Sequence, residues 1–164
     1  MSPVTEDIKA NAEVYHGDEI CQEKTKLFLK EAGLPNGLLP LKDIEEVGYA
    51  REAGFVWLKQ KNKIEHKFEK IGRLVQYATE VTAYGEPGKI KKLTGVKAKE
   101  LLIWVTLTEI SADTSNGKII FKSQAGLSKS FPESAFQIEE VKEVKDVNEV
   151  KETKEVKEAS EVKA

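Results

Sequence analysis

The chain has 164 residues, which is enough for one domain with a hydrophobic core of its own. Charged residues make up 33% of the chain, but 26 basic and 28 acidic residues leave a net charge of only −2. This near balance argues against a dedicated binder of nucleic acid, which is therefore not an expected partner.

The N-terminal segment is polar and acidic, and it lacks the apolar core of a secretory signal. The longest apolar run, Leu101 to Val105, is too short to cross a bilayer, so no transmembrane segment is predicted. The single cysteine, Cys21, excludes a disulfide within the chain, as is typical of proteins in a reducing compartment. We therefore expect a cytoplasmic protein, which we take to be a monomer.

Two helices are predicted before the first strand. Over residues 2–16, Ser2 can act as the N-cap, and apolar side chains then recur at helical spacing. A second helix is predicted over residues 18–32 and ends at Gly33 in the left-handed conformation. Cys21 lies in this helix, where its simplest role is that of a small buried apolar side chain. The buried stripe of the second helix is expected to contain Ile20, Leu27 and Phe28.

The segment GLPNGLLP, from Gly33 to Pro40, follows the second helix directly. In Leu34-Pro35-Asn36-Gly37, proline at the second position and glycine at the fourth are typical of a type I turn. Pro40 favours extended backbone at the residue before it and excludes an immediate new helix. We expect the leucines to anchor this turn on the core. The alternative is a lip that contacts a ligand, because rigid turns also carry binding sites.

Strand patterns dominate the chain after Pro40. They occur, in order, in IEEVGYA, GFVWLKQ, KIEHKF, GRLVQYATEVTAY, KELLIWVTLTEI and KIIFKS. FPESAF closes the ordered part, with Phe131 and Phe136 filling the core. About six to eight strands joined by short turns predict a mainly β fold, an antiparallel β-barrel-like single domain with one or two short N-terminal helices. A closed barrel of about eight strands is either filled by side chains or holds one small ligand, and the pattern leaves both possibilities open.

These patterns divide the chain into three parts. Residues 1–33 are an N-terminal helical segment packed on the barrel, and residues 34–138 are the β-barrel domain. Residues 139–164 form a Val-Lys-Glu-rich tail in which valine recurs every three residues. That period drifts around an α-helix and forms no apolar stripe, so the tail is predicted to be disordered. The alternative is a charged helix that forms transiently or on a partner.

No motif for a metal, a cofactor or catalysis is present. His16, Cys21 and His66 do not match the spacing of zinc ligands, and no glycine-rich loop for phosphate occurs. We therefore predict no metal, no cofactor and no catalytic residue, and a protein that is not an enzyme. The alternative is an ester-class hydrolase, which requires a hydroxyl or thiol nucleophile beside one of the two histidines.

Lysine-rich strands are the main surface signal. Residues 59–73 hold six basic and two acidic residues, and residues 89–99 hold five basic residues and no acidic one. Such strands can bind an anionic group, or they can simply keep the outer face of a sheet in water. For a ligand, the candidate aromatic contacts are Trp57, Tyr77 and Trp104. The candidate contacts to an anionic group are Lys91, Lys92 and Lys97.

Four blocks of the chain resemble a plant family catalogued as domain of unknown function 538. They are GLPNGLLP, VGYAREAGFVWL, LTGVKAKELLIWVTLTEI and FPESAF, and they extend from Gly33 to Phe136. The resemblance implies one small β-barrel-like domain with helical N-terminal decoration and no established biochemical activity, so it assigns no catalytic residue. Many members resemble secreted proteins with a signal peptide. This chain departs from them in its N-terminus and in its Val-Lys-Glu tail.

Taken together, the sequence favours a non-catalytic binding module for a small amphipathic or anionic ligand. Two alternatives stay open at this point, the ester-class hydrolase and an adaptor that captures a protein partner through its charged C-terminal tail.

Overall fold

The computed structural model describes residues 6–138. The tail predicted for residues 139–164 and the predicted N-cap at Ser2 lie outside the described residues. Within them, no helix is both long and apolar enough to span a membrane.

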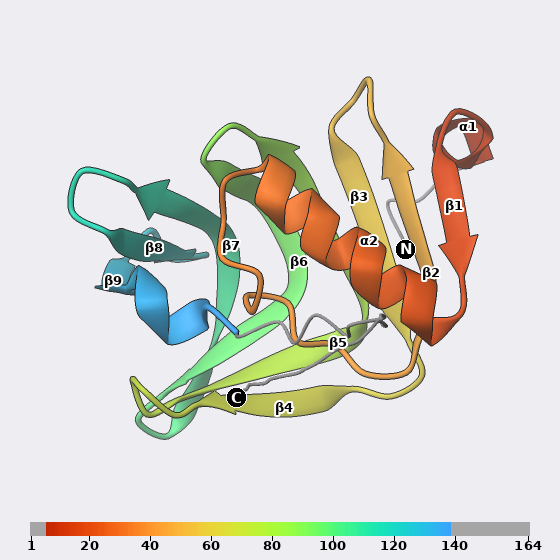
Figure 1. Ribbon diagram of the computed structural model, residues 1–164. Helices are drawn as coiled ribbons and strands as arrows, with labels where there is room; N and C mark the ends of the chain where they lie inside the picture. Colours follow the sequence, from red (N-terminus) through yellow and green to blue (C-terminus); the bar gives the residue numbers. More distant parts are fainter. Residues whose placement is uncertain (1–5, 139–164) are drawn as a thin grey trace, which may run out of the picture.

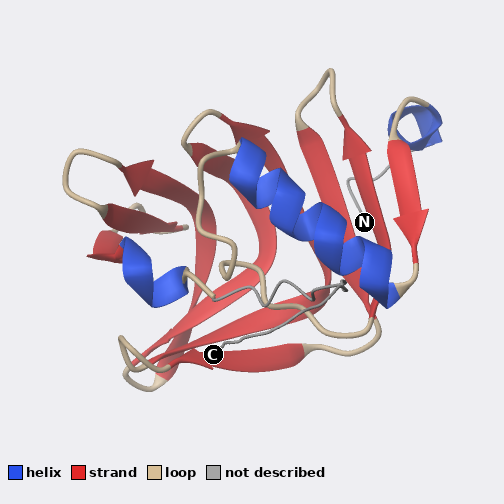
Figure 2. Ribbon diagram, in the orientation of Figure 1, coloured by secondary structure: helices blue, strands red, loops and turns tan. Residues whose placement is uncertain are grey.

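One antiparallel sheet makes up most of the described chain (Figures 1 and 2). Its strands follow the order β1-β2-β3-β5-β6-β7-β8-β9, and β4 pairs with β5 beside this path. The first five strands are β1 Glu13–His16, β2 Ile44–Ala50, β3 Phe55–Gln60, β4 Ile64–Phe68 and β5 Arg73–Glu86. The other four are β6 Lys89–Glu100, β7 Ile103–Asp113, β8 Lys118–Ser123 and β9 Ser128–Pro132. The prediction of a mainly β, antiparallel fold with short helices is thus confirmed.

The sheet is strongly curled, but it does not close into a barrel. β1 and β9 are the two ends of the strand order, so the barrel-like class fits only loosely. One half of β5 pairs with β4 and the other half with β3. The pairing of β6 with β7 is interrupted between Lys91 and Lys97, where Lys92 and Gly95 have φ values of 52° and 83°. Such interruptions bend the strands, and the bend gives the sheet a concave inner face.

The helices are α1 Glu6–Ala10, α2 Asp18–Glu31 and the 3-10 helix η1 Glu133–Phe136. α2 and η1 pack on the inner face, whereas Ile8 of α1 packs against a separate cluster that contains Phe55 and Trp57. α2 crosses the sheet in front of β2 and β3, and η1 lies near β9 (Figure 1). α2 ends as predicted at Gly33, whose φ is 77°. The amide of Gly33 donates to the carbonyl of Lys30 and that of Leu34 to the carbonyl of Leu29, which is a Schellman motif.

The segment from Gly33 to Pro40 is an anchor, as predicted. Leu34, Leu38 and Leu39 are all buried in the core. The closing hydrogen bond runs from the amide of Leu38 to the carbonyl of Pro35, so the turn begins one residue later than the sequence pattern suggested. The amide of Gly37 donates to the carbonyl of Phe136 at 2.8 Å, which fastens η1 to this segment.

The first predicted helix is wrong over its second half. Residues 13–16 form strand β1, and Tyr15 pairs with Val47 of β2. The backbone groups of this stretch bond to β2, and this tertiary pairing overrides the helical spacing of its side chains.

The buried stripe of α2 was predicted correctly at Phe28 but wrongly at Ile20 and Leu27. Ile20 and Leu27 are 39% and 38% exposed, whereas Cys21 and Phe28 are buried. The stripe further includes Thr25, whose hydroxyl donates to the carbonyl of Cys21 and is thereby satisfied inside the core. A threonine in the stripe explains the misplacement, because the sequence pattern counted apolar residues only. Cys21 itself is fully buried, as predicted.

The run KELLIWVTLTEI is not one central strand. β6 ends at Glu100 and β7 begins at Ile103, and Leu101 between them has a φ of 57°. Leu101 and Leu102 therefore form a two-residue hairpin turn without glycine or asparagine, the residues that normally indicate such a turn. The continuous apolar run concealed it.

Candidate functional site

The concave face of the sheet contains an apolar pocket of about 260 Å³. It lies between η1 and the strands from β5 to β9, where the sheet curls most strongly. Its walls consist of aliphatic and aromatic side chains that include Val75, Ala98, Val105, Leu107, Phe121 and Phe136. Only a few polar side chains reach it, which is the usual composition of a pocket for a small organic molecule.

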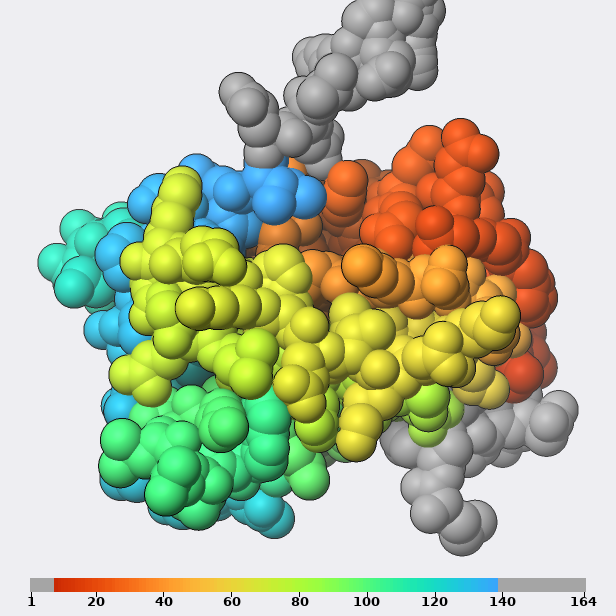
Figure 3. All heavy atoms as spheres, turned by 90° about the horizontal axis from the view of Figure 1, so that it is seen from below, coloured from red at the N-terminus to blue at the C-terminus, as the bar shows by residue number. Residues whose placement is uncertain are grey.

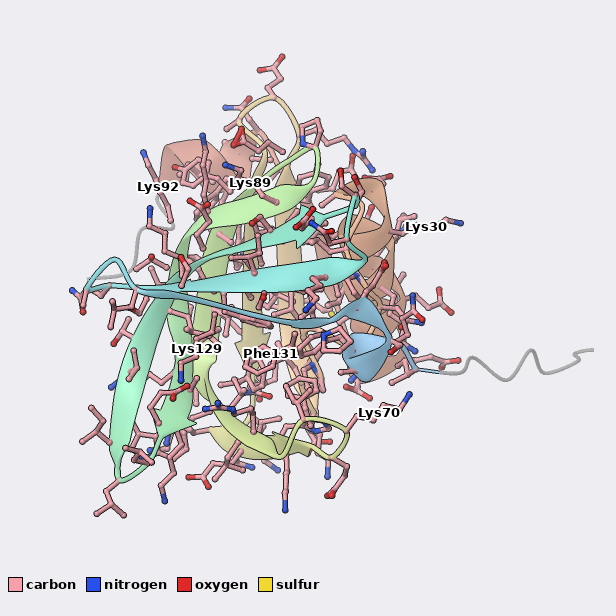
Figure 4. The ribbon with its side chains drawn as sticks, turned by 90° about the vertical axis from the view of Figure 1, so that its left-hand side faces the viewer. Lys30, Lys70, Lys89, Lys92, Lys129 and Phe131 are labelled. Atoms are coloured by element: carbon pink, nitrogen blue, oxygen red, sulfur yellow. The ribbon has the colours of Figure 1, made fainter. Side chains whose placement is uncertain are left out.

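The pleat of the strands explains why these side chains point inward. Val75, Ala98 and Val105 stand opposite one another on β5, β6 and β7, so they share the inner face. Lys97 and Lys99 flank Ala98 on β6 and point to the outer face. The same alternation directs Lys129 and Phe131 of β9 inward (Figure 4).

Three charged side chains lie together at the rim of the pocket. Glu100 accepts a hydrogen bond from Lys129 at 2.6 Å and another from Arg73 at 2.7 Å. The guanidinium of Arg73 also lies 5.3 Å from the ring centroid of Phe131. The hydrogen bond from Lys129 and that from Arg73 together lower the pKa of Glu100, against the opposing effect of its partial burial. Two cations thus face one carboxylate, and the rim has a net positive charge.

This arrangement predicts a pH-dependent contribution of Glu100 to stability. The folded-state pKa is below the ordinary value of 4.5, so the carboxylate stabilises the fold above that pH and ceases to do so as the pH falls through the folded-state pKa. We expect Glu100→Gln to lower the free energy of unfolding at neutral pH by about 1 kcal/mol or less, since the partners are partly exposed. The melting temperatures of the unmodified protein and of Glu100→Gln, measured from neutral pH to below pH 4.5, should converge as the pH falls. A difference in melting temperature that does not change with pH would show that the ionised carboxylate of Glu100 is not the cause.

Two further depressions flank α2 and are more open to solvent. The larger, of about 930 Å³, is lined by polar and charged side chains that include Glu23, Lys26 and Lys30. The second, of about 350 Å³, contains His66, whose pKa is lowered by burial and then by Lys42. We favour the pocket beneath η1, because three of its side chains, Arg73, Glu100 and Lys129, form a bonded group beside a mostly apolar wall.

The three aromatic residues chosen from the sequence lie apart from this pocket. Trp57 is fully buried, and its indole nitrogen donates to Glu46 at 2.7 Å. Tyr77 is also buried, its hydroxyl donates to the carbonyl of Leu38 at 2.9 Å, and burial raises its pKa. Trp104 lies on the outer face of β7, with the ammonium of Lys99 5.8 Å from its ring.

The three lysines chosen from the sequence are also outside the pocket wall. Lys91 forms an ion pair with Glu86 at 3.2 Å. Lys92 lies 5.5 Å from the ring of Tyr84, and Lys97 is exposed on the outer face of β6. A role of these six residues in binding stays a prediction.

The two histidines have other partners than a nucleophile. His16 lies 3.0 Å from a carboxylate oxygen of Glu46, and the ring of His66 packs edge-on against Phe68. The thiol of Cys21 donates to the carbonyl of Tyr15, and burial raises its pKa. Between residues 6 and 138 no hydroxyl or thiol bonds to either imidazole, and no cluster of three or more metal-ligating side chains occurs.

The charged residues at the rim, namely Arg73, Glu100 and Lys129, could not be predicted from the sequence. They lie on three different strands, and nothing in their local sequence distinguishes them from other surface charges. The run LLIWV contains no glycine, asparagine or proline, so the sequence carried no signal of the turn that places Glu100 at the end of a hairpin.

Comparison with known proteins identifies a family. The family model described as "Protein of unknown function, DUF538" matches residues 25–137. The chain is also 32% identical over 112 residues to the Arabidopsis thaliana protein described as "Uncharacterized protein At5g01610". That match covers 68% of this chain and 62% of the relative, so the chain spans less than two thirds of the length of that protein. No solved structure matches.

Proposed function

This chain belongs to the DUF538 family of proteins of unknown function, and we propose that it binds a small amphipathic ligand with an anionic group in the pocket beneath η1. In this proposal the protein is a non-catalytic binding module. The observation that carries it is the combination, in one place, of an apolar cavity and a rim with more positive than negative charge.

The cavity supplies the apolar part of the recognition. Its volume of about 260 Å³ equals that of roughly nine water molecules in the liquid, which suits one aromatic ring system or a short alkyl chain. Such a ligand gains free energy by leaving water for walls formed by Phe121, Phe131 and Phe136.

The rim supplies the polar part. Lys129 is 52% exposed, so its ammonium can turn from Glu100 toward a ligand without leaving a buried charge behind. Arg73 is held by Glu100 and packs against Phe131, which fixes its guanidinium beside the cavity. A carboxylate, sulfonate or phosphate at the rim would then balance the surplus positive charge.

The proposal is tested by titration with anilinonaphthalene sulfonate, whose fluorescence rises when its apolar rings leave water. We expect a saturable signal with the folded protein and displacement by octanoate. Ala98→Phe, which places a ring inside the cavity, should abolish binding. Lys129→Gln should weaken it roughly fivefold, as expected for the loss of about 1 kcal/mol from one partly exposed charge pair.

Lys122→Gln is the matched control, because Lys122 is exposed and lies next to the inward-pointing Phe121 on β8. It should bind like the unmodified protein. Circular dichroism must show that all variants are folded, since partly folded proteins also bind this dye. Equal binding by Ala98→Phe and the unmodified protein would exclude the pocket as the site.

A further inference from the structure

The turn between β6 and β7 exposes a group of large apolar side chains. Leu101 and Leu102 are 92% and 91% exposed, and Ile103 is 64% exposed. We refer to Leu101, Leu102 and Ile103 as the apolar tip. The β6–β7 turn lies at one corner of the molecule, next to the β4–β5 turn (Figures 1 and 3). Leu101 and Leu102 contribute nothing to the core, so the fold itself gives no reason for them to be leucine.

Basic and aromatic side chains adjoin the apolar tip. Lys97 and Lys99 lie on the outer face of β6, and the ring of Trp104 lies beneath the ammonium of Lys99. From residue 97 to residue 104 the sequence contains one acidic residue, Glu100. Lys129 and Arg73 both bond to it, so it does not repel an approaching anion.

We propose that the apolar tip inserts into the surface of a lipid bilayer that contains anionic lipids. Leu101 and Leu102 would enter the boundary of the acyl chains, and Trp104 would lie at the level of the headgroups, the position that tryptophan prefers. Lys97 and Lys99 would contact the anionic headgroups. The tip adjoins the proposed ligand site, since Ile103 lines the pocket and the two leucines border its charged rim. Leu101 and Leu102 themselves form no part of the pocket wall, so variants at these two positions test the tip separately.

A bilayer fits the apolar tip better than a protein partner does. A stable protein interface uses about 20–30 residues on each side, whereas the exposed apolar residues here are three consecutive ones at a hairpin turn. The narrow apolar tip can enter a fluid bilayer, and the adjoining Lys97 and Lys99 can contact its negatively charged lipids. Insertion of a few apolar side chains with electrostatic support is a general mode of reversible membrane binding.

The test is sedimentation with vesicles of phosphatidylcholine alone and of equal parts phosphatidylcholine and phosphatidylserine. The unmodified protein should bind the second kind more tightly, and added salt should weaken this binding. The double variant Leu101→Ser, Leu102→Ser should bind about tenfold to a hundredfold less tightly. A blue shift of tryptophan emission on binding should disappear in Trp104→Phe.

The matched control is the double variant Ile20→Ser, Leu27→Ser, which also removes two partly exposed apolar side chains, but from α2. It should bind vesicles like the unmodified protein. The proposal would be overturned if the variant Leu101→Ser, Leu102→Ser bound vesicles as tightly as the unmodified protein, or if the unmodified protein did not bind anionic vesicles at low salt. Self-association that the tip variant abolishes would also overturn it, because the tip would then contact a second copy of the chain. Dye binding in solution should be unchanged in the tip variant.

Discussion

Replacing Gly48 with alanine is expected to lower the free energy of unfolding by about 3 kcal/mol or more, because no space exists for a methyl group there. A Cβ atom at Gly48 would overlap the six-membered ring of Trp57, its partner across the β2–β3 hairpin. Trp57 is fully buried and its indole nitrogen is bonded to Glu46, so the ring cannot move away without breaking that bond. Denaturant titration followed by circular dichroism measures the loss.

A second glycine separates the steric cause from backbone strain. Gly72 has a φ of 63° and nothing within 4 Å of an added Cβ, so Gly72→Ala should cost only about 1 kcal/mol. Combination of Gly48→Ala with the smaller ring of Trp57→Phe should restore part of the stability that Gly48→Ala removes. Equal costs at Gly48 and Gly72 would show that ring overlap is not the cause.

Truncation of Phe136 to alanine is expected to cost about 3–5 kcal/mol. Its ring is 2% exposed and lies 5.0 Å from the ring centroid of Phe68 and 5.2 Å from that of Phe121. The residue closes one end of the pocket, so its removal would merge a new cavity with the existing one instead of letting the walls collapse. The midpoint of urea unfolding should fall accordingly.

Phe136→Leu is the matched comparison. It keeps most of the buried volume, so its cost should stay below about 1.5 kcal/mol. If Phe136→Ala were no more harmful than Phe136→Leu, η1 would contribute little to the packing, and the closed end of the pocket would need another explanation.

Helix ends and turns whose backbone conformation depends on a single residue type could be predicted from the sequence. Gly33 has a positive φ of 77° at the end of α2, as the sequence predicted. The β2–β3 hairpin also lies where two strand patterns flank a short loop with glycine. At these positions one residue type has a conformational preference strong enough to determine the backbone.

Elements that depend on distant partners could not be predicted in this way. Residues 13–16 have the spacing of a helix, but their backbone groups pair with β2, some 30 residues later in the chain. The rim of the pocket is a stronger case. Glu100 is separated from Arg73 by 27 residues and from Lys129 by 29, and only the strand register brings the three side chains together. The local spacing of apolar residues contains no information on which side chains of distant strands come into contact.

The contact between the Gly33–Pro40 segment and the end of the described chain has a consequence for the order of folding. Asn36 exchanges two hydrogen bonds with Ile138, a residue 102 positions away. During synthesis, the anchor segment leaves the ribosome long before its partner exists, and the last part of the core can form only after η1 has emerged. Non-local closure of this kind is slow. Nascent chains that end before residue 133 should therefore be sensitive to proteases, even though every long strand is already present.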